Sequence, residues 1–274
     1  MLHKILHNPQ ALIGIFLIVI LCTAALLAPF IAPHSPNEMN PSARFAEPSL
    51  EYPLGGDQLG RCEFSRLVYG ARLSLGIAIP TVAMLMIFGL LVGSICAYKG
   101  GWQDRIFTII CDVFIAFPSL VIAISLIGVL GSNIAVVLIS AVLSLWAWYV
   151  RMARVYCRKE ASKDYVPAAR VAGVSDAGIL FRHIIPNALP QFLIYACTGV
   201  ASVIMMVSGF SFLGIGLPAG TAEWGSMMNE ARPCLYSQPM LIIWPGIAVF
   251  AAAAGFTLFG EAMRDILTPE DMTI

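Results

Sequence analysis

Residues 113–150 read VFIAFPSLVIAISLIGVLGSNIAVVLISAVLSLWAWYV and contain no charged side chain. A bilayer core about 30 Å thick is crossed by roughly 20 apolar residues in a helix. The 38 residues of this run are too many for one span and enough for two. Because Gly131, Ser132 and Asn133 supply a turn, the sequence predicts two spans, over about 106–130 and 134–150.

Four further apolar runs extend this pattern to the rest of the chain. They cover residues 11–31, 73–98, about 190–209 and about 241–260. The first run is longer than the apolar region of a cleaved signal peptide, which favours an uncleaved helix. We therefore expect an all-α integral membrane protein with six transmembrane helices.

The composition excludes several classes of protein. Of the residues, 59% are hydrophobic and only 12% are charged, whereas soluble domains carry about 25% charged residues. The net charge is zero, so no nucleic acid or other polyanionic partner is indicated. The seven cysteines include no C-x-x-C pair, which argues against a structural zinc site or a redox motif.

Lysine and arginine set the expected orientation, because cytoplasmic loops are enriched in them. With the N-terminus inside, eleven basic residues fall on the inner side, namely Lys4, Lys99, Arg105, Arg151, Arg154, Arg158, Lys159, Lys163, Arg170, Arg182 and Arg264. Five fall on the outer side, namely Arg44, Arg61, Arg66, Arg72 and Arg232. Both termini are therefore predicted to be cytoplasmic.

This orientation divides the chain into segments. Residues 1–10 are expected to be a cytoplasmic N-terminus, 11–31 the first transmembrane helix, and 32–72 an extracytoplasmic segment. Residues 73–274 are expected to form a five-helix core. That core includes a cytoplasmic loop over 151–189 and an outer loop over 210–240.

The cytoplasmic loop contains the stretch VPAARVAGVSDAGILFRHIIPNALP at residues 166–190. Residues 164–174 suit a short helix loosened at Gly173, and Ser175 can cap a second helix that Pro186 ends. The second helix carries an apolar stripe, formed by Leu180, Phe181, Ile184 and Ile185. Such a helix either lies on the lipid surface or docks against a partner, and its periodicity favours neither alternative.

The spacing A-A-x-x-x-G at residues 168–173, followed nine residues later by H-I-I-P, resembles the coupling loop of ABC importer permeases. In that family the loop docks in a groove of the ATPase subunit. The resemblance implies that the docking residues are Ala168, Ala169, Arg170, Gly173, Arg182, His183 and Pro186. Pro167 replaces the glutamate that usually leads the motif, so docking is expected to depend more on packing and on the two arginines.

Further stretches carry the resemblance over nearly the whole chain. LGGDQLGRCEFSRLVYGARLSL, at residues 54–75, resembles the segment before a span in the second permease of dipeptide, oligopeptide and nickel importers. It contains a helical apolar stripe that predicts an interfacial helix, formed by Phe64, Leu67, Val68 and Ala71. TLFGEAMRDILTPE, at 257–270, is similar to the last span and tail of that family. Thr257 and Glu261 depart there from the usual Asn and Asp.

The outer loop adds T-A-E-W-G at residues 221–225. This motif recurs in the family near the external mouth of the pathway, where the substrate-binding protein docks. The resemblance thus implies that Glu223, Trp224 and Gly225 lie on the binding-protein side. LSLWAWYVRMAR at 143–154 and GFSFLGIGLPAGTAEWGSMMNEAR at 209–232 look most like the branch for nickel or metal–chelate uptake.

The resemblance implies a type I ABC importer permease in the bacterial cytoplasmic (inner) membrane. Its expected partners are a homologous second permease, one or two ATPase subunits docking on 164–186, an extracytoplasmic substrate-binding protein and membrane lipid. The sequence has no G-x-x-x-x-G-K-[ST] motif, so ATP and Mg²⁺ are expected in the partner ATPase. No enzymatic activity, cofactor or metal site is expected in this chain.

Two other classes of membrane protein remain as alternatives. An ion-coupled secondary transporter usually carries several ionisable groups near the midplane, and Asp112 is the one carboxylate in a predicted span. We expect a structural role for Asp112, paired with Arg105 or a neighbouring helix. A membrane enzyme would need catalytic motifs such as H-E-x-x-H or G-x-S-x-G, which the sequence lacks.

The cargo stays open among nickel, a metallophore, a dipeptide and an oligopeptide. The four histidines, at positions 3, 7, 34 and 183, lie outside the predicted spans. A transported metal is therefore expected to travel inside a chelate. Cys62 and Cys234 both fall on the outer side, and unpaired thiols are expected there rather than a disulfide.

Overall fold

A computed structural model of the chain describes residues 2–267. Over that range the backbone forms helices and loops and no named β-strand. In chain order the helices are α1 (Leu2–Leu6), α2 (Pro9–Ile31), η1 (Pro41–Ala43), α3 (Glu63–Lys99), α4 (Gly101–Ala116), α5 (Ser119–Leu130), α6 (Ile134–Ala161), α7 (Tyr165–Val171), α8 (Asp176–Ile179), η2 (Leu180–Ile184), α9 (Ile185–Phe212), α10 (Trp224–Ala231), η3 (Arg232–Cys234) and α11 (Met240–Leu267). Of these, η1 and η3 are 3₁₀ turns and η2 is a π-helical turn.

Most of the predicted spans appear as single long helices. In the described range five helical runs are long and apolar enough to cross a bilayer, and a sixth candidate, α4 with α5, is bent by 80°. The span predicted over 106–130 is therefore broken into two helices and not continuous. Phe117 and Pro118 interrupt it, because a residue before proline avoids the α conformation. Phe117 accordingly has a ψ of 129°.

Helix α3 begins well before the predicted span 73–98. The sequence predicted a separate interfacial helix in the outer segment, but residues 63–72 continue directly into a helix of 37 residues. The apolar stripe there packs inward, since Val68 and Ala71 are buried. Burial of this stripe against the rest of the chain keeps these turns in line with the span.

Helix α9 is continuous with the elements before it, over Asp176–Phe212. The prediction that Pro186 ends the preceding helix is wrong. The π-helical turn η2 carries an extra residue, and the Ile185 N–H bonds to the Leu180 carbonyl five residues back. This wider turn relieves the clash that proline makes in a regular helix. The Asn187 side chain then donates to the His183 carbonyl (2.8 Å).

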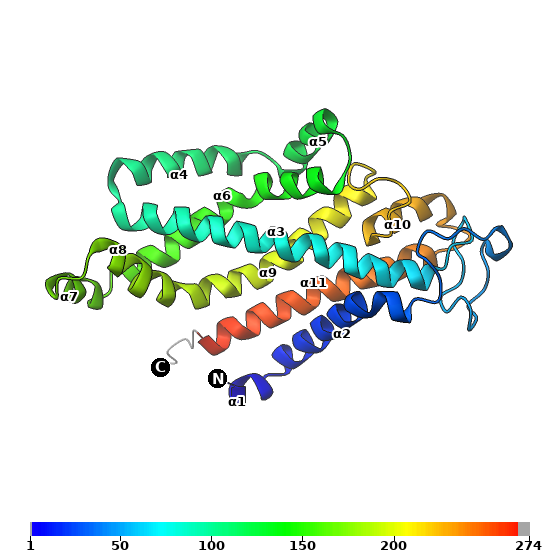
Figure 1. Cartoon of the computed structure of the whole chain (residues 1–274), viewed down its shortest axis with the longest axis horizontal. Coiled ribbons are helices and arrows are strands. Elements are labelled where there is room, and N and C mark those ends of the chain that lie inside the picture. The colour runs from blue at the N-terminus through cyan, green and yellow to red at the C-terminus, as the bar shows by residue number, and fades with distance from the viewer. Residues whose placement is uncertain (1, 268–274) are drawn as a thin grey trace.

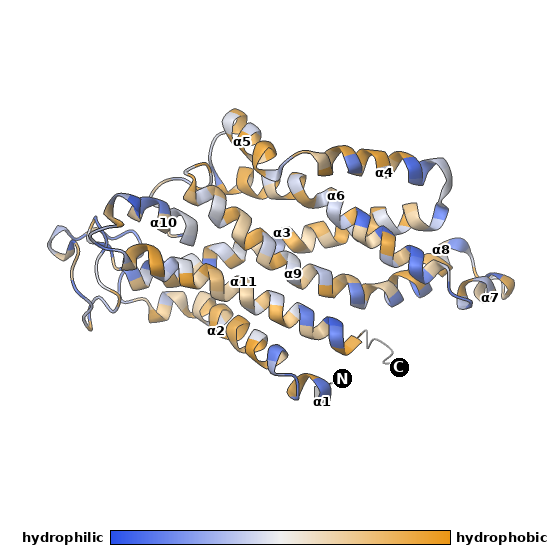
Figure 2. Ribbon diagram, turned by 180° about the vertical axis from the view of Figure 1, so that it is seen from behind, coloured by the Kyte–Doolittle hydropathy of each residue, from blue (hydrophilic) through white to orange (hydrophobic). Residues whose placement is uncertain are grey.

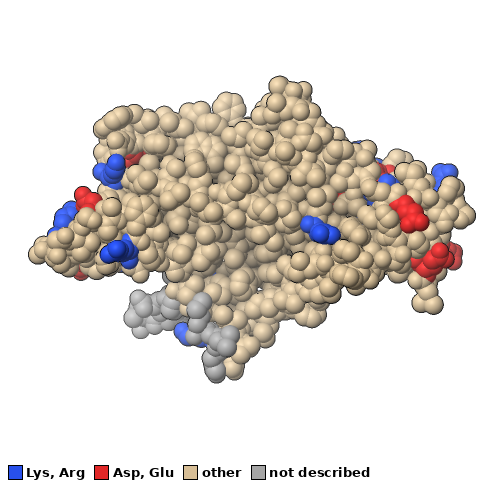
Figure 3. All heavy atoms as spheres, in the orientation of Figure 1, with Lys and Arg blue, Asp and Glu red and all other residues tan. Residues whose placement is uncertain are grey.

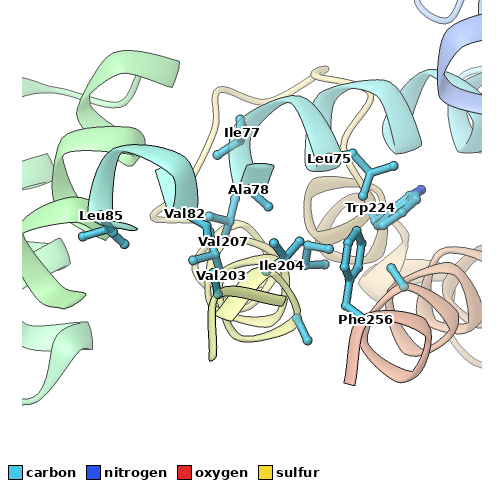
Figure 4. Close-up of a cluster of buried hydrophobic side chains, with 14 of the residues drawn as sticks. Leu75, Ile77, Ala78, Val82, Leu85, Val203, Ile204, Val207, Trp224 and Phe256 are labelled. Carbon is cyan, nitrogen blue, oxygen red and sulfur yellow. The ribbon is translucent and has the colours of Figure 1, made fainter. Parts of the chain in front are cut away.

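The main apolar core lies where α3, α9, α10 and α11 meet (Figure 4). Its side chains include Leu75, Ile77, Ala78, Val82, Leu85, Val203, Ile204, Val207, Trp224 and Phe256. Helix α2 runs along α11 (Figure 1) and approaches it closely at Gly14. A Cβ there would lie 2.7 Å from the Phe259 nitrogen, so a small residue permits the contact, as is common between membrane helices.

The bundle is elongated, and its two ends differ from its middle. Apolar residues dominate the long helices (Figure 2), and on the face in Figure 3 charged side chains gather mainly at the two ends. Helices α7 and α8 form one end, toward which α1 and the end of α11 also lie (Figure 1). Helix α10 and residues 32–62 form the opposite end. Which side of the membrane each end faces stays a prediction.

Candidate functional site

The first candidate site is the protrusion formed by residues 164–186, which we call the elbow. Helix α7 ends in a Schellman motif: the Val174 N–H bonds to the Ala169 carbonyl (3.1 Å) and the Gly173 N–H to the Arg170 carbonyl (3.1 Å). Gly173 has a φ of +80°, a conformation that glycine adopts without strain. The Ser175 hydroxyl caps α8 by accepting the Gly178 N–H (3.2 Å), as the sequence predicted.

Polar contacts fix the elbow to helix α3. The Tyr98 hydroxyl at the end of α3 donates to Asp176, and Arg170 donates to the Tyr98 oxygen (3.1 Å). Arg170 also lies 3.5 Å from the Asp176 carboxylate. The hydrogen bond to Tyr98 raises the pKa of Arg170 above its ordinary value.

Helix α6 supplies the second anchor of the elbow. The buried Glu160 accepts from Lys163 (2.8 Å) and from the Tyr165 hydroxyl (3.2 Å). Burial is the main reason that the pKa of the Tyr165 phenol is raised. Val166 and Ile179, on the inner side of the elbow, are buried in a cluster with Ala188 of helix α9. These contacts attach the elbow to α3, α6 and α9.

The two adjacent alanines of the elbow face opposite ways. Ala169 packs against the buried cluster beneath the elbow, whereas Ala168 is exposed. Pro167, Val171 and Ala172 are also exposed beside it, with Val171 at 91%. The elbow thus presents a surface of small and apolar side chains. Sequence reasoning missed Val171, although it lies three residues after Ala168 and hence on the same helical face.

The remaining predicted residues of this loop lie in η2 and at the start of α9. Arg182 and Pro186 are exposed and His183 is partly buried, with its ring 6.5 Å from that of Tyr165. Of the predicted apolar stripe, Leu180 and Ile184 are buried, but Phe181 is 52% exposed. Leu180 and Ile184 are four residues apart and share the inner face, whereas Phe181 follows Leu180 directly and therefore lies at the edge of that face.

The second candidate site is the α10 end, where the structure places the T-A-E-W-G motif. Glu223 is completely buried. Its carboxylate accepts from the hydroxyls of Ser208 (2.9 Å) and Ser74 (3.3 Å) and caps α10 through the Ser226 N–H (3.0 Å). Glu223 therefore joins α3, α9 and α10.

Trp224 and Gly225, which follow Glu223, are also closely packed against neighbouring helices. The Trp224 indole N–H donates to the Leu67 carbonyl (3.0 Å), and a Cβ at Gly70 would lie 2.8 Å from the Trp224 ring. A Cβ at Gly225 would collide with the carbonyl oxygen of Ser208. Glu223, Trp224 and Gly225 are thus all buried in this chain, and their location at a binding-protein surface stays a prediction.

A buried network of charges completes the α10 end. Arg61 pairs with Asp57 and with Glu230, both at 2.5 Å. Arg66 lies 3.4 Å from Asp57 and 3.2 Å from Glu230. Sequence reasoning did not find this network. The one indication in the sequence was the closeness of Asp57, Arg61 and Arg66, which lie within ten residues of one another. Nothing in the sequence linked these residues to Glu230.

Two family models match the chain. Residues 89–270 match the model described as "Binding-protein-dependent transport system inner membrane component". Residues 1–48 match "N-terminal TM domain of oligopeptide transport permease C". The first match covers well over half of the sequence. The chain belongs to the family of binding-protein-dependent transport system inner membrane components.

Curated relatives of this permease are similar over nearly their full length. The nickel transport system permease protein NikC of Escherichia coli K12 is 34% identical over 95% of this chain and 94% of its own. The dipeptide transport system permease protein DppC of Alkalihalophilus pseudofirmus is 34% identical over 96% and 86%. The metal-staphylopine import system permease protein CntC of Staphylococcus aureus is 33% identical over 98% and 93%. The predicted family and the multi-pass membrane location are confirmed.

In this permease, ion pairs hold the bent α4 against α6. Asp112 pairs with Arg151, and both side chains are substantially exposed. Asp104 is more buried and bonds to Arg154 through two hydrogen bonds, one of them at 2.6 Å. Asp112 thus pairs with a neighbouring helix, one of the two partners that the sequence left open.

We expect the Asp112→Asn permease to insert, assemble and transport within about twofold of the parent, because asparagine keeps an oxygen that can accept the hydrogen bond from Arg151. The matched Asp104→Asn change should reduce the amount of folded permease, since the amide keeps one acceptor oxygen but loses the negative charge and one of the two hydrogen bonds that the carboxylate accepts from Arg154. Both effects are measured by cargo uptake and by membrane yield. Normal assembly with abolished uptake in Asp112→Asn would instead assign Asp112 to transport.

The seven cysteines of the permease all lie within the described range and are free. Cys62 is buried in a small cluster with Ala43 and Tyr52, whereas Cys234 is partly exposed in η3. The two thiols are therefore unpaired, as expected.

Proposed function

We propose that this chain is the membrane-spanning permease subunit of an ATP-driven ABC importer and forms half of its translocation pathway. The observation that carries the proposal is the elbow, a partly apolar protrusion that polar and apolar contacts attach to one end of the bundle. Family membership and the names of the relatives support the importer class. The ATPase subunit would dock on residues 164–186.

The attachment of the elbow to the membrane helices favours docking of the ATPase on the elbow over an elbow that only lies on the lipid surface. A lipid-bound helix would need no rigid link to the bundle. Here the elbow is tied to α3 through Tyr98 and to α6 through Glu160. Its exposed surface has small side chains that allow close approach of a second backbone. A movement of the ATPase at the elbow would therefore tilt the spans.

The other partners follow from this role. ATP and Mg²⁺ would be bound by the ATPase, and this chain would have no enzymatic activity of its own. A homologous second permease would supply the other half of the pathway. A substrate-binding protein would deliver cargo at the α10 end, which would then face outward, with the elbow and both termini in the cytoplasm.

The relatives suggest the class of cargo. Their names refer to nickel, dipeptides and a metal–staphylopine complex. We infer a small polar cargo of this kind, either a metal chelate or a short peptide. Comparing the growth of a deletion strain under nickel starvation with its growth on peptides as the amino-acid source would separate the two.

Reconstitution in proteoliposomes tests the proposal. The chain alone should carry no cargo. The complex with the second permease, the ATPase and the binding protein should accumulate cargo only when ATP and Mg²⁺ are present on the ATPase side. Uptake by the chain alone, driven by an ion gradient, would instead establish the alternative, an ion-coupled secondary transporter.

A further inference from the structure

A groove of about 390 Å³ lies between α6, α9 and α11 toward the elbow end. Each helix contributes residues at helical spacing, so that three faces converge on one space. Its lining includes Met152, Tyr156 and Lys159 of α6, Gln191, Tyr195 and Thr198 of α9, and Gly260, Glu261 and Arg264 of α11. This volume is within the range of ligand-binding pockets.

The groove has polar groups among its apolar lining, although it lies between membrane-spanning helices. Two phenols, an amide and a hydroxyl line it, and the same face of α9 continues to the exposed Ser202. Elsewhere α9 exposes apolar side chains such as Leu193. Polar groups within membrane spans usually face the bundle interior or a water-filled cavity. Ser202 and Leu193 therefore lie on different faces of α9, one continuous with the groove and the other apolar.

The charges at the mouth of the groove favour an anion. Lys159 and Arg264 line it together with a single carboxylate, Glu261, which leaves one net positive charge. None of these three forms an ion pair within residues 2–267. Such a lining attracts carboxylates and repels a bare divalent cation.

We propose that this groove is the part of the cargo route that this chain lines at the elbow end. It would accept a small polar molecule bearing carboxylate and amide or amine groups, such as a short peptide or an anionic metal chelate. This inference rests on the proposed permease function and adds to it the residues of the route and the charge of the cargo.

Cysteine accessibility tests the inference in the complete complex, in inside-out membrane vesicles. The parent carries Cys197→Ser, because Cys197 lies in α9 itself. Thr198→Cys and Ser202→Cys place thiols on the polar face, and Leu193→Cys is the matched control on the apolar face of the same helix. The probes are two water-soluble methanethiosulfonates, one anionic and one cationic. The labelling rate of each cysteine with each reagent is divided by the rate at which the same reagent reacts with a small free thiol in solution.

We expect Thr198→Cys and Ser202→Cys to react at least tenfold faster than Leu193→Cys. The anionic reagent should react about fivefold faster than the cationic one, given the net charge of the lining. Adding Lys159→Gln and Arg264→Gln should reverse that preference, because only the negative charge of Glu261 then remains in the lining. Arg158→Gln should leave it unchanged, because Arg158 lies beside Asp104 instead of lining the groove.

Three outcomes would overturn the inference. Labelling of Thr198→Cys only by a lipid-soluble maleimide would mean that lipid fills the groove. No labelling by any reagent would mean that protein covers it, and a preference for the cationic reagent would contradict the assigned cargo charge. The same vesicles are also assayed for bound ATPase. If the ATPase is retained, such a labelling result contradicts only the assignment of the groove. If the parent permease binds no ATPase, the proposed function itself is wrong.

Discussion

The Ala168→Glu permease should lose its ATPase subunit on purification, and ATP-driven uptake should fall at least tenfold, while the chain still inserts in the membrane. Ala168 is exposed on the face of α7 that also carries Val171. A glutamate there would add bulk and a charge to a surface proposed to pack closely against the ATPase. Burial of an unpaired charge in such an interface is strongly unfavourable.

Ala219→Glu is the matched control, because Ala219 is an exposed alanine near the opposite end of the bundle. That variant should co-purify with the ATPase as well as the parent does. If Ala168→Glu also retains the ATPase and full uptake, the elbow does not dock there.

Two other substitutions in the elbow should have the same outcome for a different reason. Gly173→Pro cannot adopt the φ of +80°, since proline is fixed near −65°, so it should unfold the end of α7. Ala169→Glu would insert a charge into the cluster beneath the elbow. Both changes damage the elbow itself, as faster protease cleavage after α6 would reveal. Ala168→Glu should leave that cleavage rate unchanged, and this difference separates loss of docking from loss of structure.

The Arg66→Leu permease should be destabilised by about 3–5 kcal/mol, as is typical when one partner of a buried ionic network is removed. Arg66 is 1% exposed and lies between Asp57 and Glu230, and it also donates to the Thr221 carbonyl (3.4 Å). Without it the two carboxylates share Arg61 alone. The change would be measured as a lower midpoint of thermal unfolding in detergent and as a lower membrane yield.

Arg72→Leu is the matched control, since Arg72 lies on the same helix but is exposed and forms no ion pair within the described residues. Its unfolding midpoint should stay close to that of the parent. Equal midpoints for Arg66→Leu and Arg72→Leu would show that the network contributes little to stability.

Local sequence was sufficient to predict the features that depend on neighbouring residues. Runs without charge predicted the membrane spans, because a span requires about 20 apolar residues wherever it occurs. Gly173 and Ser175 likewise predicted the end of α7 and the start of α8, since capping involves atoms only a few residues apart. The helix break before Pro118 and the continuation of the helix through Pro186 could not be predicted in the same way. Proline is compatible with a kink, a helix end or a widened turn, and the local sequence does not choose among them.

The amino-acid sequence by itself determined that this chain crosses the membrane as a helical bundle, and it predicted a coupling motif in the loop over 151–189. Only the tertiary structure decided that Ala168 is exposed while Ala169 is partly buried, that Glu223 is buried, and that three separate helices line one groove. The physical reason is distance along the chain. Arg61 meets Glu230 across 169 residues, and such contacts depend on how whole helices pack, which no local pattern encodes.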